Sequence, residues 1–134
     1  MAKHLVDTDV YIDLIQSGST LPILRQLYEK EAPGIFFSSV VAEELLAGAR
    51  SLFHPFEKAG RVVTPNHNVW KESGMVLAKI LTRRPDLRIK LPALVNDCLI
   101  ALSARFIGAT VYTKNRDDFL LIQTIEQFQL VVIH

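Results

Sequence analysis

Acidic side chains stand in four separate segments of this 134-residue chain, and each segment lies close behind a short apolar run or at the start of a helical pattern. The acids in question are Asp7 and Asp9, Glu43 and Glu44, Asp97, and Asp117 and Asp118. The helical neighbours of Glu44 and Asp97 at three- and four-residue spacing are all apolar or small, so neither acid has a Lys or Arg partner there. A carboxylate on the packing side of a helix is costly unless it is paired or bound to a metal ion.

Clustered carboxylates repel one another, so a site built from three or four of them implies a cation. Oxygen ligands alone favour magnesium or manganese over zinc, which prefers His and Cys. The histidines show no metal-ligand spacing and are interpreted as surface or packing residues: His4, His54, His67 and His134. Cys98 lies in an apolar helical pattern and is interpreted as a core residue and not a nucleophile. The neighbouring Asp97 would also raise the pKa of its thiol.

Short apolar runs alternate with longer helical patterns along the chain. The predicted strands cover residues 3–6, 35–38, 61–64, 109–113 and 130–133, and the predicted helices cover 21–30, 40–50, 69–81, 92–106 and 117–125. Ser39 is the predicted N-cap of the second helix. This alternation predicts an α/β fold with a mainly parallel sheet covered by helices on both faces.

The predicted topology brings the acids together. Asp7 directly follows the first strand, and the helices that hold Glu44 and Asp97 begin on the side of the sheet where the strands end. A residue about five positions into such a helix is still within roughly 8 Å of that edge. Functional crevices of open parallel sheets lie outside the C-terminal strand ends, so we expect one carboxylate site there.

Composition limits the other possibilities. The net charge is +1, which is not the strongly basic balance of a protein that coats nucleic acid, although residues 82–90 carry a local charge of +3. No run is long and apolar enough for a membrane span, and the N-terminus has no apolar signal core. With a lone Cys98, these features predict a soluble, cytoplasmic protein with a single domain over residues 1–134.

One rival motif is present. Asp7-Thr8-Asp9 after an apolar strand is the start expected of a haloacid-dehalogenase-like phosphohydrolase, in which the first Asp is the nucleophile and the second an acid/base. Tyr11 stands where that family has a small residue, and this interpretation leaves Glu44 and Asp97 unexplained. Glycine-rich phosphate loops and the G-x-S-x-G elbow are absent from the sequence.

Four ordered blocks, VDTDVYIDL, SSVVAEELLAGA, LVNDCLIALSAR and TKNRDDF, resemble the motifs of PIN-domain nucleases over nearly the whole chain. Residue by residue, the resemblance selects Asp7 in the first block, Glu44 in the E-L-x-x-G block and Asp97 in the N-D-x-L-I-A block. In the last block Thr113, Asn115 and Asp118 match the family pattern. Some members carry the acid at the position of Asn115, so the fourth ligand stays open between Asp118, Asn115 and Asp117.

The resemblance implies a three-layer α/β/α PIN-like fold with about five strands and a magnesium- or manganese-dependent ribonuclease. It assigns catalysis and metal binding to Asp7, Glu44, Asp97 and Asp118, with Thr8, Asp9, Thr113 and Asn115 orienting ligands or phosphate. The short form resembles the VapC-type toxins of toxin–antitoxin pairs, which implies a homodimer inhibited by a small VapB-like antitoxin. A degraded PIN-like site that only binds RNA or protein is the alternative. Candidates for steering RNA are Arg83, Arg84, Arg88, Arg105, Lys114 and Arg116.

Overall fold

The computed structural model describes residues 1–17, 22–45 and 50–134, and its centre is a five-stranded sheet. The strands are β1 (Lys3–Val6), β2 (Ile35–Ser38), β3 (Val62–Val63), β4 (Ala109–Thr113) and β5 (Gln129–Val132). Their order is β3-β2-β1-β4-β5, and every neighbouring pair is parallel. The chain leaves β1 toward β2 and later returns past it to β4, so the strand order switches between β1 and β4. In open parallel sheets such a switch point is where a crevice forms at the C-terminal strand ends.

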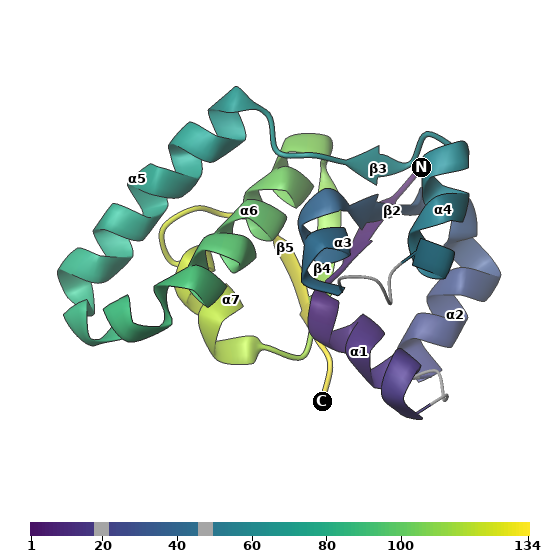
Figure 1. Cartoon of the computed structure of the whole chain (residues 1–134), viewed down its shortest axis with the longest axis horizontal. Helices are drawn as coiled ribbons and strands as arrows, with labels where there is room; N and C mark the ends of the chain where they lie inside the picture. The colour runs from purple at the N-terminus through teal and green to yellow at the C-terminus, as the bar shows by residue number, and fades with distance from the viewer. Residues whose placement is uncertain (18–21, 46–49) are drawn as a thin grey trace.

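Helices cover both faces of this sheet, which gives the predicted three-layer α/β/α arrangement (Figure 1). One side carries α1 (Thr8–Ser17), α2 (Pro22–Glu31) and α4 (Arg50–Lys58), and the other α5 (His67–Arg83), α6 (Leu91–Ile107) and α7 (Arg116–Gln123). The short α3 (Ser39–Leu45) packs against α1 and α6. Two 3-10 segments, η1 (Ala32–Gly34) and η3 (Pro85–Lys90), precede β2 and α6. No helix in the described ranges is long and apolar enough to span a bilayer.

The predicted strands are all present, within one or two residues at their ends, but two helices differ from prediction. No helix was predicted over Thr8–Ser17 from the sequence. In α1 the apolar Val10 and Tyr11 are buried, but Ile12 and Ile15 are also apolar and are exposed, so the sequence shows no clear apolar stripe. The helix Arg50–Lys58 was also missed, since Pro55 inside it is a helix breaker in a sequence-based prediction. The predicted helix over 40–50 is described only up to Leu45, and positions 46–49, like Leu21 of the predicted helix over 21–30, lie outside the described residues.

The predicted N-cap of α3 is wrong by one residue. Ser39 is the first helical residue, and the Oγ of Ser38 accepts the backbone N–H groups of Val40 (3.1 Å) and Val41 (3.4 Å). Ser38 is the last residue of β2, so the strand passes into the helix without an intervening loop. This immediate passage keeps the start of α3 at the C-terminal edge of the sheet.

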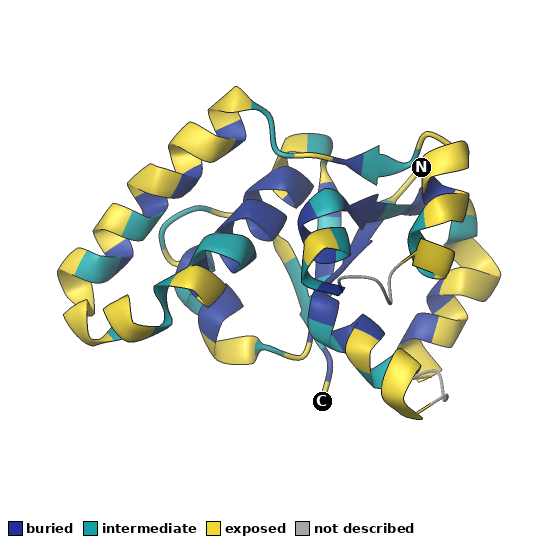
Figure 2. Ribbon diagram, viewed as in Figure 1, coloured by how far each residue is buried: buried dark blue, intermediate teal, exposed yellow. Residues whose placement is uncertain are grey.

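The core lies between the sheet and its helices, and buried residues follow the strands and the inward helix faces (Figure 2). The central α6 is buried over most of its length because the sheet, α5 and α7 all pack on it. Cys98 on this helix is fully buried, and burial, then the nearby Asp97 carboxylate, raise the pKa of its thiol to about 12. The interpretation of Cys98 as a core residue is thereby confirmed.

Gly34 is expected to tolerate no side chain. A Cβ at this position would lie 2.1 Å from the backbone oxygen of Ala2, and backbone yields less than a flexible side chain. Gly34→Ala is therefore expected to lower the free energy of unfolding by roughly 1–3 kcal/mol. Gly74→Ala is the matched control, because nothing lies within 4 Å of a Cβ there and Ala is favoured over Gly in a helix. Urea denaturation checks both, and an unchanged midpoint for Gly34→Ala would contradict the expectation.

Candidate active site

The strand-order switch point holds a buried carboxylate. Asp7 follows β1 directly and is 3% exposed. Its Oδ1 accepts the backbone N–H of Thr8 at 2.8 Å, and its Oδ2 accepts the hydroxyl of Thr113 at 2.7 Å. Thr113 ends β4, so this bond joins the C-terminal ends of the two central strands. The crevice predicted from topology therefore begins at Asp7.

The second acid comes from α3. The Thr8 hydroxyl donates to Oε1 of Glu44 at 2.6 Å, while the neighbouring Glu43 is exposed. Thr8 is thus in contact with both Asp7 and Glu44, one through its backbone and the other through its side chain. The structure places Glu44, and not Glu43, beside Asp7, as the sequence motif predicted.

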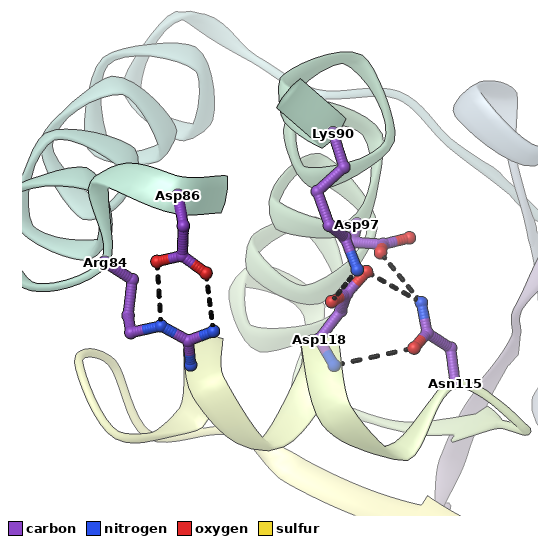
Figure 3. A network of polar contacts seen from close by, with 6 residues as sticks. All are labelled: Arg84, Asp86, Lys90, Asp97, Asn115 and Asp118. Carbon is purple, nitrogen blue, oxygen red and sulfur yellow. Dashed lines mark hydrogen bonds and ion pairs between the residues drawn. The ribbon is translucent and has the colours of Figure 1, made fainter. Parts of the chain in front are cut away.

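A third group joins α6 to the turn after β4 (Figure 3). The Nδ2 of Asn115 donates to Oδ2 of Asp97 at 3.2 Å and to Oδ2 of Asp118 at 3.0 Å. Its Oδ1 accepts the backbone N–H of Asp118 at 3.5 Å and so caps α7. Asp97 lies in the second turn of α6, whose N-terminal end faces the same edge of the sheet. Asn115 thereby holds two carboxyl groups from different helices side by side.

The remaining predicted residues differ in how close they lie to this cluster. Asp9 acts on Asp7 electrostatically, and its Oδ1 accepts the backbone N–H of Lys114 at 3.3 Å. Asp117 is exposed, whereas Asp118 is buried, so the structure brings Asp118 and Asn115 into the cluster and leaves Asp117 at its rim.

Three of the six predicted RNA-steering cations, Arg84, Arg105 and Lys114, are paired with acids of the chain itself. Arg105 lies at the far end of α6, where it pairs with Glu126 (3.0 Å) and donates to the Gln127 carbonyl. At 1.5 Å per residue, about 12 Å separates it along the helix from Asp97, so a role of Arg105 in steering RNA stays a prediction. Lys114 is paired with Asp13.

The contact of Lys90 with the carboxylate cluster was not predicted from the sequence. Arg84 pairs with Asp86 within the basic segment, but Lys90 donates its Nζ to Oδ1 of Asp118 at 2.6 Å (Figure 3). The sequence offered one indication of this contact: the basic segment ends directly before the helix that carries Asp97.

Burial and mutual repulsion dominate the electrostatics of the cluster. Burial, then the charges of Asp9 and Glu44, raise the pKa of Asp7 to about 7. Burial, then the charge of Asp7, raise the pKa of Asp97 to about 9. Burial alone would also raise the pKa of Asp118, but hydrogen bonds led by that of Lys90 hold it below the usual range. A compensating positive charge therefore stabilises the ionised cluster.

The donor set fits a hard divalent cation. The acids that converge on the crevice offer carboxylate oxygens, and Thr8, Thr113 and Asn115 add hydroxyl and amide oxygens. Magnesium and manganese prefer such ligands. Within the described ranges, no three His, Cys, Asp or Glu side chains stand in a metal-binding arrangement. Hydroxyl, amide and ammonium groups of the chain itself donate to these carboxylates. The chemistry of the residues fits a cation, whose binding would require some of these bonds to rearrange.

These pKa shifts predict how the metal-free stability depends on pH. Because the pKa of Asp97 is about 9 in the folded chain against an ordinary 3.8, the folded state binds protons more tightly than the unfolded state. The free energy of unfolding therefore falls as pH rises between these values, by at most about 1.4 kcal/mol per pH unit for one such group. In chelator, the melting temperature is expected to be higher near pH 6 than near pH 8.5. Asp97→Asn should make the melting temperature depend less steeply on pH. The same pH dependence in the variant and in wild type would contradict a raised pKa for Asp97.

Comparison with known proteins identifies the family. The model of the PIN domain matches residues 4–123. Among solved structures, the DNA-bound VapBC of Salmonella typhimurium aligns with a TM-score of 0.66 and 21% identity over 98% of both chains. VapBC-1 of nontypeable Haemophilus influenzae gives a TM-score of 0.63 and 21% identity over 96% of both chains. A toxin-antitoxin complex from Klebsiella pneumoniae gives 0.56 and 20% over 97% of both.

A search of curated proteins gave no match. At these identities the structural likeness shows a shared fold, whereas the family model covers nearly the whole chain, including the segments that carry Asp7, Glu44, Asp97 and Asp118. The chain therefore belongs to the PIN domain family.

Proposed function

We propose that this chain is a ribonuclease that depends on magnesium or manganese, held by Asp7, Glu44, Asp97 and Asp118. The observation that carries the proposal is the convergence of these four acids, from four separate segments, at the C-terminal edge of β1 and β4. Membership of the PIN domain family supports it, since the sequence motifs resemble those of the family's nucleases. For the fourth ligand we choose Asp118 over Asp117 and Asn115, because Asp118 is a buried carboxylate, whereas Asp117 is exposed and the Asn115 amide is uncharged.

The chain's own residues would orient this chemistry. Thr113 and the Thr8 backbone hold both oxygens of Asp7, the Thr8 hydroxyl holds Glu44, and Asn115 spaces Asp97 from Asp118. A divalent cation bound here would lower the pKa of a water molecule and polarise the scissile phosphate. In-line attack of such a water on phosphorus would break the P–O3′ bond, and the products would carry 5′-phosphate and 3′-hydroxyl ends. Asp9 lies close enough to Asp7 to orient water or phosphate from outside the four ligands.

The test compares two substrates. Purified protein is incubated with structured RNA or with p-nitrophenyl phosphate, each with magnesium, manganese or chelator. We expect the protein to cleave RNA but not p-nitrophenyl phosphate, and to lose RNA cleavage in chelator. Metal-dependent hydrolysis of p-nitrophenyl phosphate alone would instead favour the haloacid-dehalogenase-like alternative, which membership of the PIN domain family already argues against. RNA binding without cleavage under all conditions would favour the degraded binding module.

Divalent metal is expected to stabilise the fold, because it relieves repulsion among the buried carboxylates. A ligand at 100 times its dissociation constant adds about 2.7 kcal/mol to the free energy of unfolding, which is several degrees in melting temperature for a domain of this size. Thermal unfolding with several millimolar manganese or magnesium measures the shift. The control is buffer without divalent cations, brought to equal ionic strength with sodium chloride. An equal rise in melting temperature in that control would count against a specific metal site.

We further propose that the nuclease is the toxin of a toxin–antitoxin pair, acts in the cytoplasm, forms a homodimer and is inhibited by a small VapB-like protein. The likeness of the fold to VapBC structures and to a toxin-antitoxin complex supports this. Co-expression with a small adjacent reading frame is expected to give a co-purifying complex that no longer cuts RNA. Light scattering on the isolated chain tests the dimer, and a monomer at all concentrations would exclude it.

A further inference from the structure

Lys90 connects the basic segment to the carboxylate cluster. It is the last residue of η3, directly before α6, and its Nζ lies 2.6 Å from Oδ1 of Asp118. The Asp118 side chain is only 6% exposed, whereas that of Lys90 is 41% exposed. A buried carboxylate is thus compensated by a flexible ammonium group that reaches it from the solvent side.

The two oxygens of Asp118 have different partners. Oδ2 accepts the neutral amide of Asn115, while Oδ1 accepts the full positive charge of Lys90 (Figure 3). A divalent cation on the same carboxylate would lie within a few ångströms of this ammonium, and two positive charges that close repel each other. The ammonium and a divalent cation bound to this carboxylate would therefore compete for Asp118.

Lys90 has space into which it can move. It lines an open pocket of about 510 Å³ between η3 and α7, together with Arg84, Leu87 and Leu121. The lysine stem has four rotatable bonds, and its partial exposure allows the ammonium to be rehydrated there. Release of Lys90 thus needs no change in the backbone.

We propose that Lys90 is a positioning residue that neutralises Asp118 in the metal-free protein and is displaced from it when a divalent cation binds. This inference rests on the proposed function, because it takes Asp118 to be a metal ligand. The bond to Lys90 places a positive charge against the buried Asp118 carboxylate and holds it in place, and it lowers the affinity of the site for metal. The metal affinity of the chain is then set in part by a residue that lies outside the four acids.

Manganese binding to the metal-free protein tests this, measured by isothermal titration calorimetry. Lys90→Met is expected to lower the dissociation constant roughly tenfold, as removal of a partly screened neighbouring charge does. Lys90→Arg keeps the charge and should bind like wild type. Arg88→Met removes the same charge from the same exposed segment and should change the constant less than about twofold. Lys90→Gln supplies a second neutral variant, and circular dichroism checks that each variant is folded.

A double-mutant cycle shows whether Lys90 acts through Asp118. In an Asp118→Asn background, Lys90→Met should no longer tighten manganese binding, since the shared carboxylate is gone. If Lys90 only pins η3 to α7, Lys90→Met will lower the melting temperature and leave the dissociation constant unchanged, which overturns the inference while the proposed function stands. If wild type and every variant fail to bind manganese, both fall, because no metal exists for Lys90 to oppose.

Discussion

Asp97→Asn is expected to abolish RNA cleavage while leaving the metal-free protein at least as stable as wild type. The carboxyl of Asp97 is buried beside Asp7 and Asp118, and this surrounding raises its pKa to about 9, which marks a position where a negative charge is costly. Asn has the same shape and keeps an oxygen that can accept the 3.2 Å bond from Asn115. The substitution therefore removes the cost of burying an ionised carboxylate, or of protonating it, without leaving a cavity.

The opposite result is expected if Asp97 only supports the fold. Loss of a buried polar partner lowers the free energy of unfolding by roughly 1–3 kcal/mol. Urea denaturation in chelator, manganese-dependent melting and RNA cleavage are measured on the same preparation. Asp86→Asn is the matched control, because Asp86 is exposed and pairs with Arg84 outside the cluster. An Asp97→Asn protein that is clearly less stable than wild type and still cuts RNA would remove Asp97 from the site.

Glu44→Gln is expected to reduce metal-dependent cleavage by on the order of 100-fold or more. Loss of a residue that only supports a metal ligand already costs about 10- to 100-fold in activity. Glu43→Gln should leave most of the activity. The two residues are adjacent, but the Thr8 hydroxyl donates to Glu44 at 2.6 Å, while Glu43 is exposed on α3. Glutamine keeps the length of the side chain and an acceptor oxygen. A loss of activity in Glu44→Gln can therefore be attributed to the loss of the negative charge of Glu44.

The measurement is the initial rate of RNA cleavage at saturating manganese, followed by a manganese titration. Glu44→Gln should also shrink the metal-induced rise in melting temperature, since one ligand charge is lost. Equal loss of activity in both variants would mean that the phase of α3 has been misread. Full activity in Glu44→Gln would remove Glu44 from the site and leave Asp7 with no partner acid from β2's side of the sheet.

The strand pattern predicted the architecture because fully buried parallel strands are short apolar runs and the helices between them bury one face. This holds for β1, β2 and β4, which the sequence placed at their observed bounds. It failed for Thr8–Ser17, where Ile12 and Ile15 are apolar but exposed, and for Arg50–Lys58, where Pro55 interrupts the pattern. In both helices packing against the rest of the chain outweighs local preference.

The acids could be predicted because a residue that follows a parallel strand must lie at the functional edge of the sheet, as Asp7 does. The bonds between them could not. The link from Asn115 to Asp97 and Asp118, and the pairing of Lys90 with Asp118, depend on side-chain rotamers and on where α7 sits against η3 and α6. Spacing along the sequence carries no information about such contacts between distant segments.

The chemistry of the RNA ends tests the central claim most directly. Wild-type protein with manganese should give products that carry 5′-phosphate and 3′-hydroxyl groups, because water activated at the carboxylate cluster attacks the phosphate in line. Asp97→Asn, purified in parallel, should give none of these products, which controls for a contaminating nuclease. Products with 2′,3′-cyclic phosphate and 5′-hydroxyl ends, formed equally in chelator, would contradict a metal-dependent site at Asp7, Glu44, Asp97 and Asp118.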